Sequence, residues 1–170
     1  MENLQEIYSE KKNEIRARLE DFRNLKKEDW KKEFVFCLLT PQSNAQRCWA
    51  AVAEIFSLSE IDEEKVKDIL IRKTRFHNTK AKRVIEGLKF WNEISGKLDG
   101  EAVELRNWLA ENVNGYGLKE AGHFLRNIGK SDNKIAILDR HILRNLKKFG
   151  AIKDEKIKSK IYNYFFSFHS

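Results

Sequence analysis

Along most of this chain, apolar residues recur every three or four positions, the spacing that gathers them on one face of an α-helix. The first such pattern includes Leu4, Ile7, Ile15, Leu19 and Phe22. The same periodicity predicts five further helices, over residues Trp30–Leu38, Asn44–Phe56, Asp62–Arg72, Thr79–Ile94 and Glu101–Glu111. Asp29 is placed to cap the second helix and Pro41 to end it. In the third helix we expect an inward face of Trp49, Val52, Ala53 and Phe56.

The last part of the chain continues the helical pattern. After a glycine-containing turn at residues 113–119, the next helix is expected to run to about Ile128 and to end at Gly129. Asp139 is predicted to begin a helix that ends near Phe149, and a lysine-rich last helix is predicted from about Asp154. No segment alternates with the period of two that is typical of strands. The predicted fold class is therefore all-α.

Composition narrows the class of protein. The 170 residues suit one ordinary domain or two small helical lobes that share a cleft. Cys37 and Cys48 are too few for a disulfide scaffold, have no metal-ligand spacing to a histidine, and are interpreted as buried small apolar residues. No apolar run approaches the roughly 18 residues of a membrane span, so we expect a cytoplasmic protein. The net charge of +7 favours a polyanionic partner without identifying one.

The most informative local pattern is the turn Asn114-Gly115-Tyr116-Gly117 between two amphipathic helices. Both glycines can adopt positive φ, and such a turn can direct backbone N–H groups outward to bind a phosphate. A tight interhelical loop with a glycine cap is the alternative interpretation. Lys119 follows in the first helical turn, where the helix dipole disfavours a cation. Either the amine is needed as a nucleophile of lowered pKa, or the lysine is simply solvated.

These residues lie within a motif that resembles the helix–hairpin–helix DNA glycosylase superfamily. The resemblance rests on Gly115–Ala121 followed by Ile137–Ile142, and the run from Lys119 to Gly129 is most similar to the archaeal and thermophile-type 8-oxoguanine DNA glycosylase/AP lyases. It extends from about Phe34 to about Ile152. The resemblance implies two helical lobes with a DNA-binding cleft, formed by residues 1–170 as a single unit, with the helix–hairpin–helix at about residues 103–128.

The resemblance also implies roles for individual residues. Lys119 would attack C1′ of the damaged nucleoside and form a Schiff base, after which β-elimination breaks the strand. Asp139 would stabilise the oxocarbenium character of the transition state, although it is equally suited to cap its own helix. His141 would contact a backbone phosphate, unless it is only a surface histidine. Asn114, Gly115 and Gly117 would bind DNA at the hairpin.

Two further site residues lie outside this motif. Gln42 would enter the gap left by the flipped nucleotide, where an amide can bond the orphaned base. Phe76 would stack on the extruded base. The alternatives are a polar interhelical turn for Gln42 and a core aromatic for Phe76. Other expectations place the four tryptophans in the core, His123 as a packed residue, and Lys80 to Arg83 on the DNA-facing surface.

The sequence thus predicts a bifunctional DNA glycosylase/AP lyase that excises 8-oxoguanine in base excision repair. We expect it to act as a monomer on double-stranded DNA, in the cytoplasm with the nucleoid, without a metal or a redox cofactor because the lysine supplies the nucleophile. One alternative is an enzyme of the same superfamily that acts on another damaged base or on abasic sites only. The other is a non-catalytic helix–hairpin–helix module. The aromatic tail, Tyr162–Ser170, does not align with the expected ending and either completes the base pocket or packs the last helix.

Overall fold

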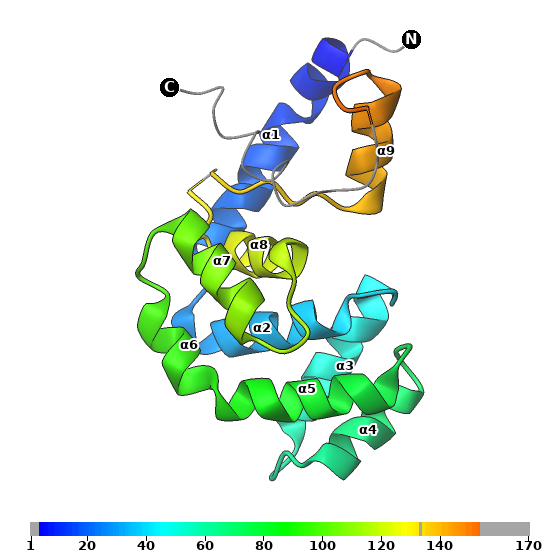
Figure 1. Ribbon diagram of the computed structural model, residues 1–170, viewed down its shortest axis with the longest axis vertical. Coiled ribbons are helices and arrows are strands. Elements are labelled where there is room, and N and C mark those ends of the chain that lie inside the picture. The colour runs from blue at the N-terminus through cyan, green and yellow to red at the C-terminus, as the bar shows by residue number, and fades with distance from the viewer. Residues whose placement is uncertain (1–3, 133, 154–170) are drawn as a thin grey trace.

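The computed structural model describes residues 4–132 and 134–153, and over these residues it consists of helices and loops (Figure 1). The elements in chain order are α1 (Leu4–Arg23), the short 3-10 helix η1 (Lys27–Asp29), α2 (Trp30–Leu39), α3 (Ala45–Ser57), α4 (Glu63–Ile71), α5 (His77–Lys89), α6 (Trp91–Lys97), α7 (Ala102–Asn112), α8 (Leu118–Asn127) and α9 (Arg140–Lys148). The predicted all-α class is confirmed. The helix predicted from Asp154 and the aromatic tail lie outside the described residues.

Helix α2 forms the centre of the molecule, with α3, α5 and α8 packed around it (Figure 1). Its residues 34–39 are all buried, because an uninterrupted apolar run leaves no polar face to turn toward water. The Phe34 ring lies 5.4 Å from the ring of Trp91, 5.2 Å from that of Tyr116 and 5.8 Å from that of Phe124, measured between centroids. Helices α3, α5 and α8, which adjoin Gln42, Phe76 and Lys119, therefore share α2 as their support.

Side-chain caps explain where several helices begin. Asn44 Oδ1 accepts from the backbone N–H of Arg47 at 3.1 Å, and Asp62 Oδ1 accepts from that of Lys65 at 2.9 Å. Asp29 does precede α2 as predicted, but it does not cap it. Its carboxylate instead accepts from Lys32 Nζ at 2.7 Å, and its backbone is helical because it ends η1.

One predicted helix is divided in two. The range Thr79–Ile94 contains the end of α5, residue Phe90 and the first part of α6. Phe90 has φ −86° and ψ −1°, which turns the chain between the two helices. Its ring stacks on that of Trp108 in α7, with the centroids 5.8 Å apart. The pattern of apolar positions continues through this turn, which is why periodicity alone predicted a single helix.

The inward face of α3 also differs from the prediction. Its buried residues are Cys48, Ala51, Val52 and Ile55, whereas Ala53 is exposed and Phe56 is partly buried. Trp49 is 38% exposed and stacks on Phe36, with the ring centroids 4.5 Å apart. Because the buried residues are mostly small, α3 can approach α2 closely, and the large indole covers the edge of the contact instead of filling the core.

In Figure 1 the N-terminal part of α1 rises above helices α2 to α8, at the level of α9. Its C-terminal half contributes the partly buried Leu19 and Phe22, but Ile7 and Ile15 are exposed. The predicted apolar face of this helix is thus only half covered. Within residues 4–132 and 134–153, no helix has the length and apolar character needed to span a bilayer.

Candidate active site

The hairpin between α7 and α8 depends on a different conformation at each of its glycines. Gly115 has φ +95°, and a Cβ there would lie only 2.5 Å from Arg83 Cδ, so both the backbone and the available space favour glycine. Gly117 has φ −112° and ψ −177°, which is extended backbone, so the prediction of positive φ is wrong at this position. Gly117 is the N-cap of α8, and N-cap residues normally adopt extended backbone.

The hairpin N–H groups are used within the fold. The N–H of Tyr116 donates to the carbonyl of Val113 at 3.0 Å, and that of Gly117 donates to Glu120 Oε2 at 3.2 Å. The expectation that these groups point outward is therefore wrong for these two residues. Asn114 is exposed, and its Nδ2 donates to Glu86 Oε2 at 2.8 Å, which ties the turn to α5.

Tyr116 anchors the hairpin to the central helix. Its side chain is buried, and its hydroxyl donates to the carbonyl of Phe34 at 2.9 Å. Burial, more than the nearby thiol of Cys37, raises the pKa of this phenol well above its usual value. Tyr116 therefore remains a neutral donor, which fixes the start of α8 relative to α2.

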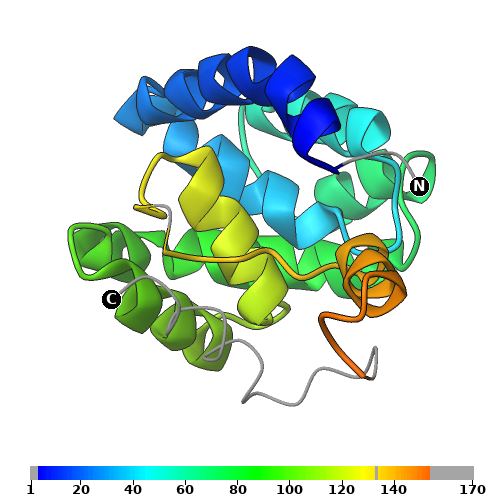
Figure 2. The same ribbon diagram turned by 90° about the horizontal axis from the view of Figure 1, so that it is seen from above.

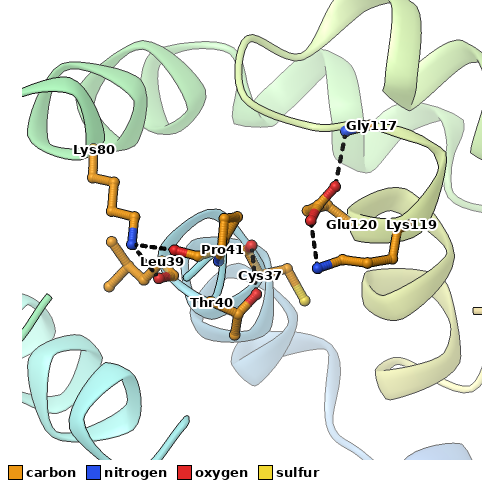
Figure 3. A network of polar contacts seen from close by, with 8 residues as sticks. All are labelled: Cys37, Leu39, Thr40, Pro41, Lys80, Gly117, Lys119 and Glu120. Carbon is orange, nitrogen blue, oxygen red and sulfur yellow. Dashed lines mark hydrogen bonds and ion pairs between the residues drawn. The ribbon is translucent and has the colours of Figure 1, made fainter. Parts of the chain in front are cut away.

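Lys119 is the second residue of α8, and it forms an ion pair with the next residue. Its Nζ lies 2.7 Å from Glu120 Oε1, and the Lys119 side chain is 31% exposed. Because the other oxygen of Glu120 accepts from the Gly117 N–H, one carboxylate connects the amine to the hairpin (Figure 3). This acid offsets the unfavourable position of a cation at a helix N-terminus. The sequence reasoning missed Glu120, although a glutamate three residues after an N-cap is the capping-box spacing.

Asp139 is the N-cap of α9, and its Oδ1 accepts from the N–H of Ile142 at 2.9 Å. The capping interpretation is thus confirmed. The segment before it crosses α8 at Gly122, where a Cβ would lie 2.8 Å from Ile135 Cγ2 (Figure 2). Leu138 also packs in one cluster with Leu118, at the start of α8. Both contacts bring the chain that carries Asp139 to the end of α8 where Lys119 lies.

His141 follows as the second residue of α9 and is exposed, so its side chain is accessible to a ligand. His123, on α8, behaves differently. It packs edge-on against Phe36, with the ring centroids 5.8 Å apart, as the sequence predicted. Burial, followed by the charges of Arg126 and Lys119, lowers its pKa to about 4, so the imidazole is neutral at pH 7.

Two loops on the other side of the α2 C-terminus carry the remaining candidates. Gln42 is exposed in the loop between α2 and α3, with φ +54°. Phe76 precedes α5 with φ +59° and is 55% exposed, so the alternative that it belongs to the core is wrong. Non-glycine residues rarely adopt this left-handed conformation, and they do so most often where a site requires it.

An open hollow of about 290 Å³ lies between these two loops. Several cationic and polar side chains line it, among them Gln42, Ser43, Asn44, Arg47, Lys73 and Arg75. Of these cations, Lys73 is paired with Glu54 at 2.7 Å. The Arg75 guanidinium lies 5.8 Å from the centroid of the Phe76 ring. The hollow is therefore a basic surface next to an exposed aromatic ring.

Lys80 does not lie on a DNA-facing surface, contrary to the prediction. It is buried, and its Nζ donates to the carbonyls of Leu39 and Pro41 and to the Ser43 hydroxyl. A signal was present in the sequence, because Lys80, Ala81 and Val84 share one helical face that is otherwise apolar. Figure 3 shows the end of α2 between Lys80 on one side and Lys119 on the other.

Both cysteines are buried, as predicted, and burial raises the pKa of each thiol. Among residues 4–132 and 134–153, no group of three or more His, Cys, Asp or Glu side chains is arranged to hold a metal ion. The chemistry that the arrangement offers is that of an amine, a carboxylate beside it and a second carboxylate at the start of α9.

Comparison with known proteins gives a consistent result. The sequence profile of the 8-oxoguanine DNA glycosylase family matches residues 15–167, which extends past both ends of the stretch on which the resemblance was based. A Fusobacterium nucleatum protein named 8-oxoguanine DNA glycosylase/AP lyase is 35% identical over 89% of this chain and 75% of its own length. A protein of the same name from Sulfurisphaera tokodaii is 36% identical over 92% of this chain and 81% of its own length.

Solved structures agree with the sequence relatives. The 8-oxoguanine DNA glycosylase of Thermotoga maritima superposes with a TM-score of 0.83 at 31% identity, over 95% of this chain and 80% of that one. The Methanocaldococcus jannaschii 8-oxoguanine glycosylase/lyase, in complex with a 15mer DNA containing 8-oxoguanine, superposes with a TM-score of 0.81 at 30% identity. That superposition covers 96% of this chain and 83% of the other.

Proposed function

This chain belongs to the 8-oxoguanine DNA glycosylase family, and we propose that it excises 8-oxoguanine from duplex DNA and then cleaves the strand, with Lys119 as its nucleophile. The observation that carries the proposal is the ion pair between Lys119 Nζ and Glu120 Oε1, at 2.7 Å, beside the α7–α8 hairpin. Because the second oxygen of Glu120 is fixed by the Gly117 N–H, the amine and its partner have a defined position at the start of α8.

The ion pair supplies the first proton transfer. An ammonium has no lone pair, so Lys119 must lose a proton before it can attack, and Glu120 Oε1 is already within hydrogen-bond distance to accept it. The neutral amine then bonds to C1′ while the N-glycosidic bond breaks, and the base leaves with the bonding electrons and takes up the proton that the new C1′ amine releases. Ring opening gives a Schiff base, and loss of a C2′ proton expels the 3′ phosphate.

Asp139 is the second acid of the proposed site. Its N-cap hydrogen bond fixes the direction of the carboxylate, so that it can stabilise positive charge at C1′ without reorganising. The proposed DNA contacts are Asn114, Gly115 and His141 on the damaged strand's phosphates, Gln42 in the gap left by the flipped nucleotide, and Phe76 on the extruded base. Gly117, the other expected contact, has its N–H bound to Glu120 Oε2 and offers no free donor to a phosphate.

The proposal also covers the domain organisation, the oligomeric state and the location of the protein. Residues 1–170 act as one glycosylase unit, which agrees with a single family match over residues 15–167. We also propose that it acts as a monomer. With duplex DNA as its proposed partner, we expect it in the cytoplasm with the nucleoid.

Borohydride trapping tests the proposed function. Wild-type protein incubated with an 8-oxoguanine duplex and borohydride should form a covalent protein–DNA adduct, because reduction fixes the Schiff base. Lys119→Gln should form none while it still binds the duplex, and Lys89→Gln, at an exposed position of α5, is the control for loss of a lysine charge. If the wild-type protein is trapped on neither 8-oxoguanine nor abasic DNA, the lyase proposal is wrong.

A further inference from the structure

A buried lysine connects the two loops that carry Gln42 and Phe76. Lys80 is 2% exposed, and its Nζ donates to the Leu39 carbonyl at 2.7 Å, the Pro41 carbonyl at 2.9 Å and the Ser43 hydroxyl at 2.8 Å. All three N–H groups of the ammonium thus donate hydrogen bonds to one short segment. That segment is the end of α2 and the loop that presents Gln42.

The end of α2 explains how a lysine can be buried there without a carboxylate. The last carbonyls of a helix lack intrahelical donors and carry the negative end of the helix dipole. Lys80 satisfies the carbonyl of Leu39, the last residue of α2. Burial, with a smaller contribution from the Arg83 charge, still lowers the pKa of Lys80 to about 8. A group that is this costly to bury is retained where its geometry is used.

Ser43 extends the connection to the second loop. Its Oγ accepts from Lys80 Nζ and also from the backbone N–H of Arg75, at 3.1 Å. Arg75 directly precedes Phe76. One hydroxyl therefore joins the residue after Gln42 to the residue before Phe76, and both Gln42 and Phe76 have left-handed backbone. An isolated loop would not hold either conformation without such support.

We propose that Lys80 and Ser43 are positioning residues, which hold the Gln42 loop and the Phe76 loop in register so that both side chains engage the DNA together. The inference rests on the proposed function, because it assumes that Gln42 and Phe76 act on the flipped nucleotide and its partner strand. Neither Lys80 nor Ser43 touches the reacting atoms. Their effect is on the geometry of flipping, where a small misplacement slows the chemistry strongly.

The test compares Ser43→Ala, which removes the shared acceptor, with Ser43→Thr, which keeps it. Lys80→Met removes the donor, and Lys89→Met is the matched control because it removes the same charge from an exposed position of α5. Single-turnover excision of 8-oxoguanine should slow by roughly ten- to a hundredfold in Ser43→Ala and Lys80→Met. Ser43→Thr and Lys89→Met should stay within about twofold of wild type. If Lys80→Met fails to fold, Ser43→Ala still tests the proposal.

Two further readouts separate positioning from a general loss of stability. In a double-mutant cycle, Ser43→Ala should slow excision much less in a Gln42→Ala background than in wild type, because the effect passes through Gln42. Amide hydrogen exchange, which needs no DNA, should accelerate in residues 72–76 of Ser43→Ala while α8 is unchanged. Additive effects, or unchanged exchange in residues 72–76, would overturn the inference. If wild-type protein does not excise 8-oxoguanine but Ser43→Ala still accelerates exchange in residues 72–76, the proposed function is refuted and the connection between the two loops is not.

Discussion

The hairpin and the loop pair lie on opposite sides of the α2 C-terminus and are held in place in different ways. In the hairpin, Gly117 and Glu120 bond across three positions of sequence. In the loop pair, Lys80 reaches Leu39 across 41 positions, and Arg75 reaches Ser43 across 32. The Lys119–Glu120 pair is thus organised locally, whereas the loops of Gln42 and Phe76 depend on tertiary contacts. Three changes test how far this contrast extends.

The largest effect is expected on the hairpin side, at Asp139. Asparagine caps helices about as well as aspartate, so Asp139→Asn should leave the free energy of unfolding almost unchanged. It should slow 8-oxoguanine excision by about 10²- to 10⁴-fold, because the neutral amide cannot stabilise charge at C1′. Single-turnover kinetics and urea unfolding measure the two effects. Equal excision rates in Asp139→Asn and wild type would leave this residue with its capping role alone.

A smaller effect is expected from acid, at His123 under the hairpin. Its pKa is about 4 in the folded protein, against 6.5 for an ordinary histidine, so the unfolded chain binds the proton more readily. The stability that His123 contributes is complete above pH 6.5 and is lost as the pH falls toward 4, by roughly 3 kcal/mol in total.

Urea unfolding of wild type and His123→Leu between pH 7 and pH 4 measures this loss. The difference between the two proteins isolates His123, since the other titrating groups, such as Glu33 with its raised pKa, are common to both. A constant difference across this pH range would show that the imidazole is not held in its neutral form.

The smallest effect is expected on the loop side, where Gln42 has left-handed backbone. Gln42→Gly and Gln42→Ala both remove the amide and should both slow excision, but only glycine relieves the conformation. Gln42→Gly should therefore be more stable than Gln42→Ala by about 1 kcal/mol in urea unfolding. Gly115→Ala is the reciprocal control on the hairpin, and it should be destabilised. Equal stability of the two Gln42 variants would mean that the loop relaxes away from φ +54° when the side chain is removed.

The sequence predicted the parts of the fold that depend on local spacing. The all-α class, most helix positions, the hairpin and the cap at Asp139 follow from periodicity and from the preferences of single residues. The turn at Phe90 was not predictable in this way, because it depends on stacking against Trp108. Positive φ was expected at Gly117 as well as at Gly115, because the sequence does not show which of two glycines in a turn is the N-cap. Gly117 is the N-cap of α8 and has extended backbone.

The residues of the candidate site also divide into those that local sequence predicts and those that only tertiary contacts place. Lys119 stands out in the sequence because it lies beside glycines at a helix start, and its partner Glu120 is adjacent to it. Lys80 was placed on the surface, because a lysine among charged neighbours is usually solvated. What buries it is the end of α2, which lies about forty positions earlier in the chain and is brought there only by folding.

The bond from Tyr116 to Phe34 spans 82 positions, and the bond from Asn127 Nδ2 to Glu33 Oε2 spans 94. Long-range contacts of this kind slow folding, because a large loop of chain must close before either bond can form. During synthesis, α2 emerges early but cannot complete its packing until α8 has been made. The hairpin and α8 therefore acquire their fixed position on α2 late in folding, whereas the bond between the Gly117 N–H and Glu120 can form locally before that.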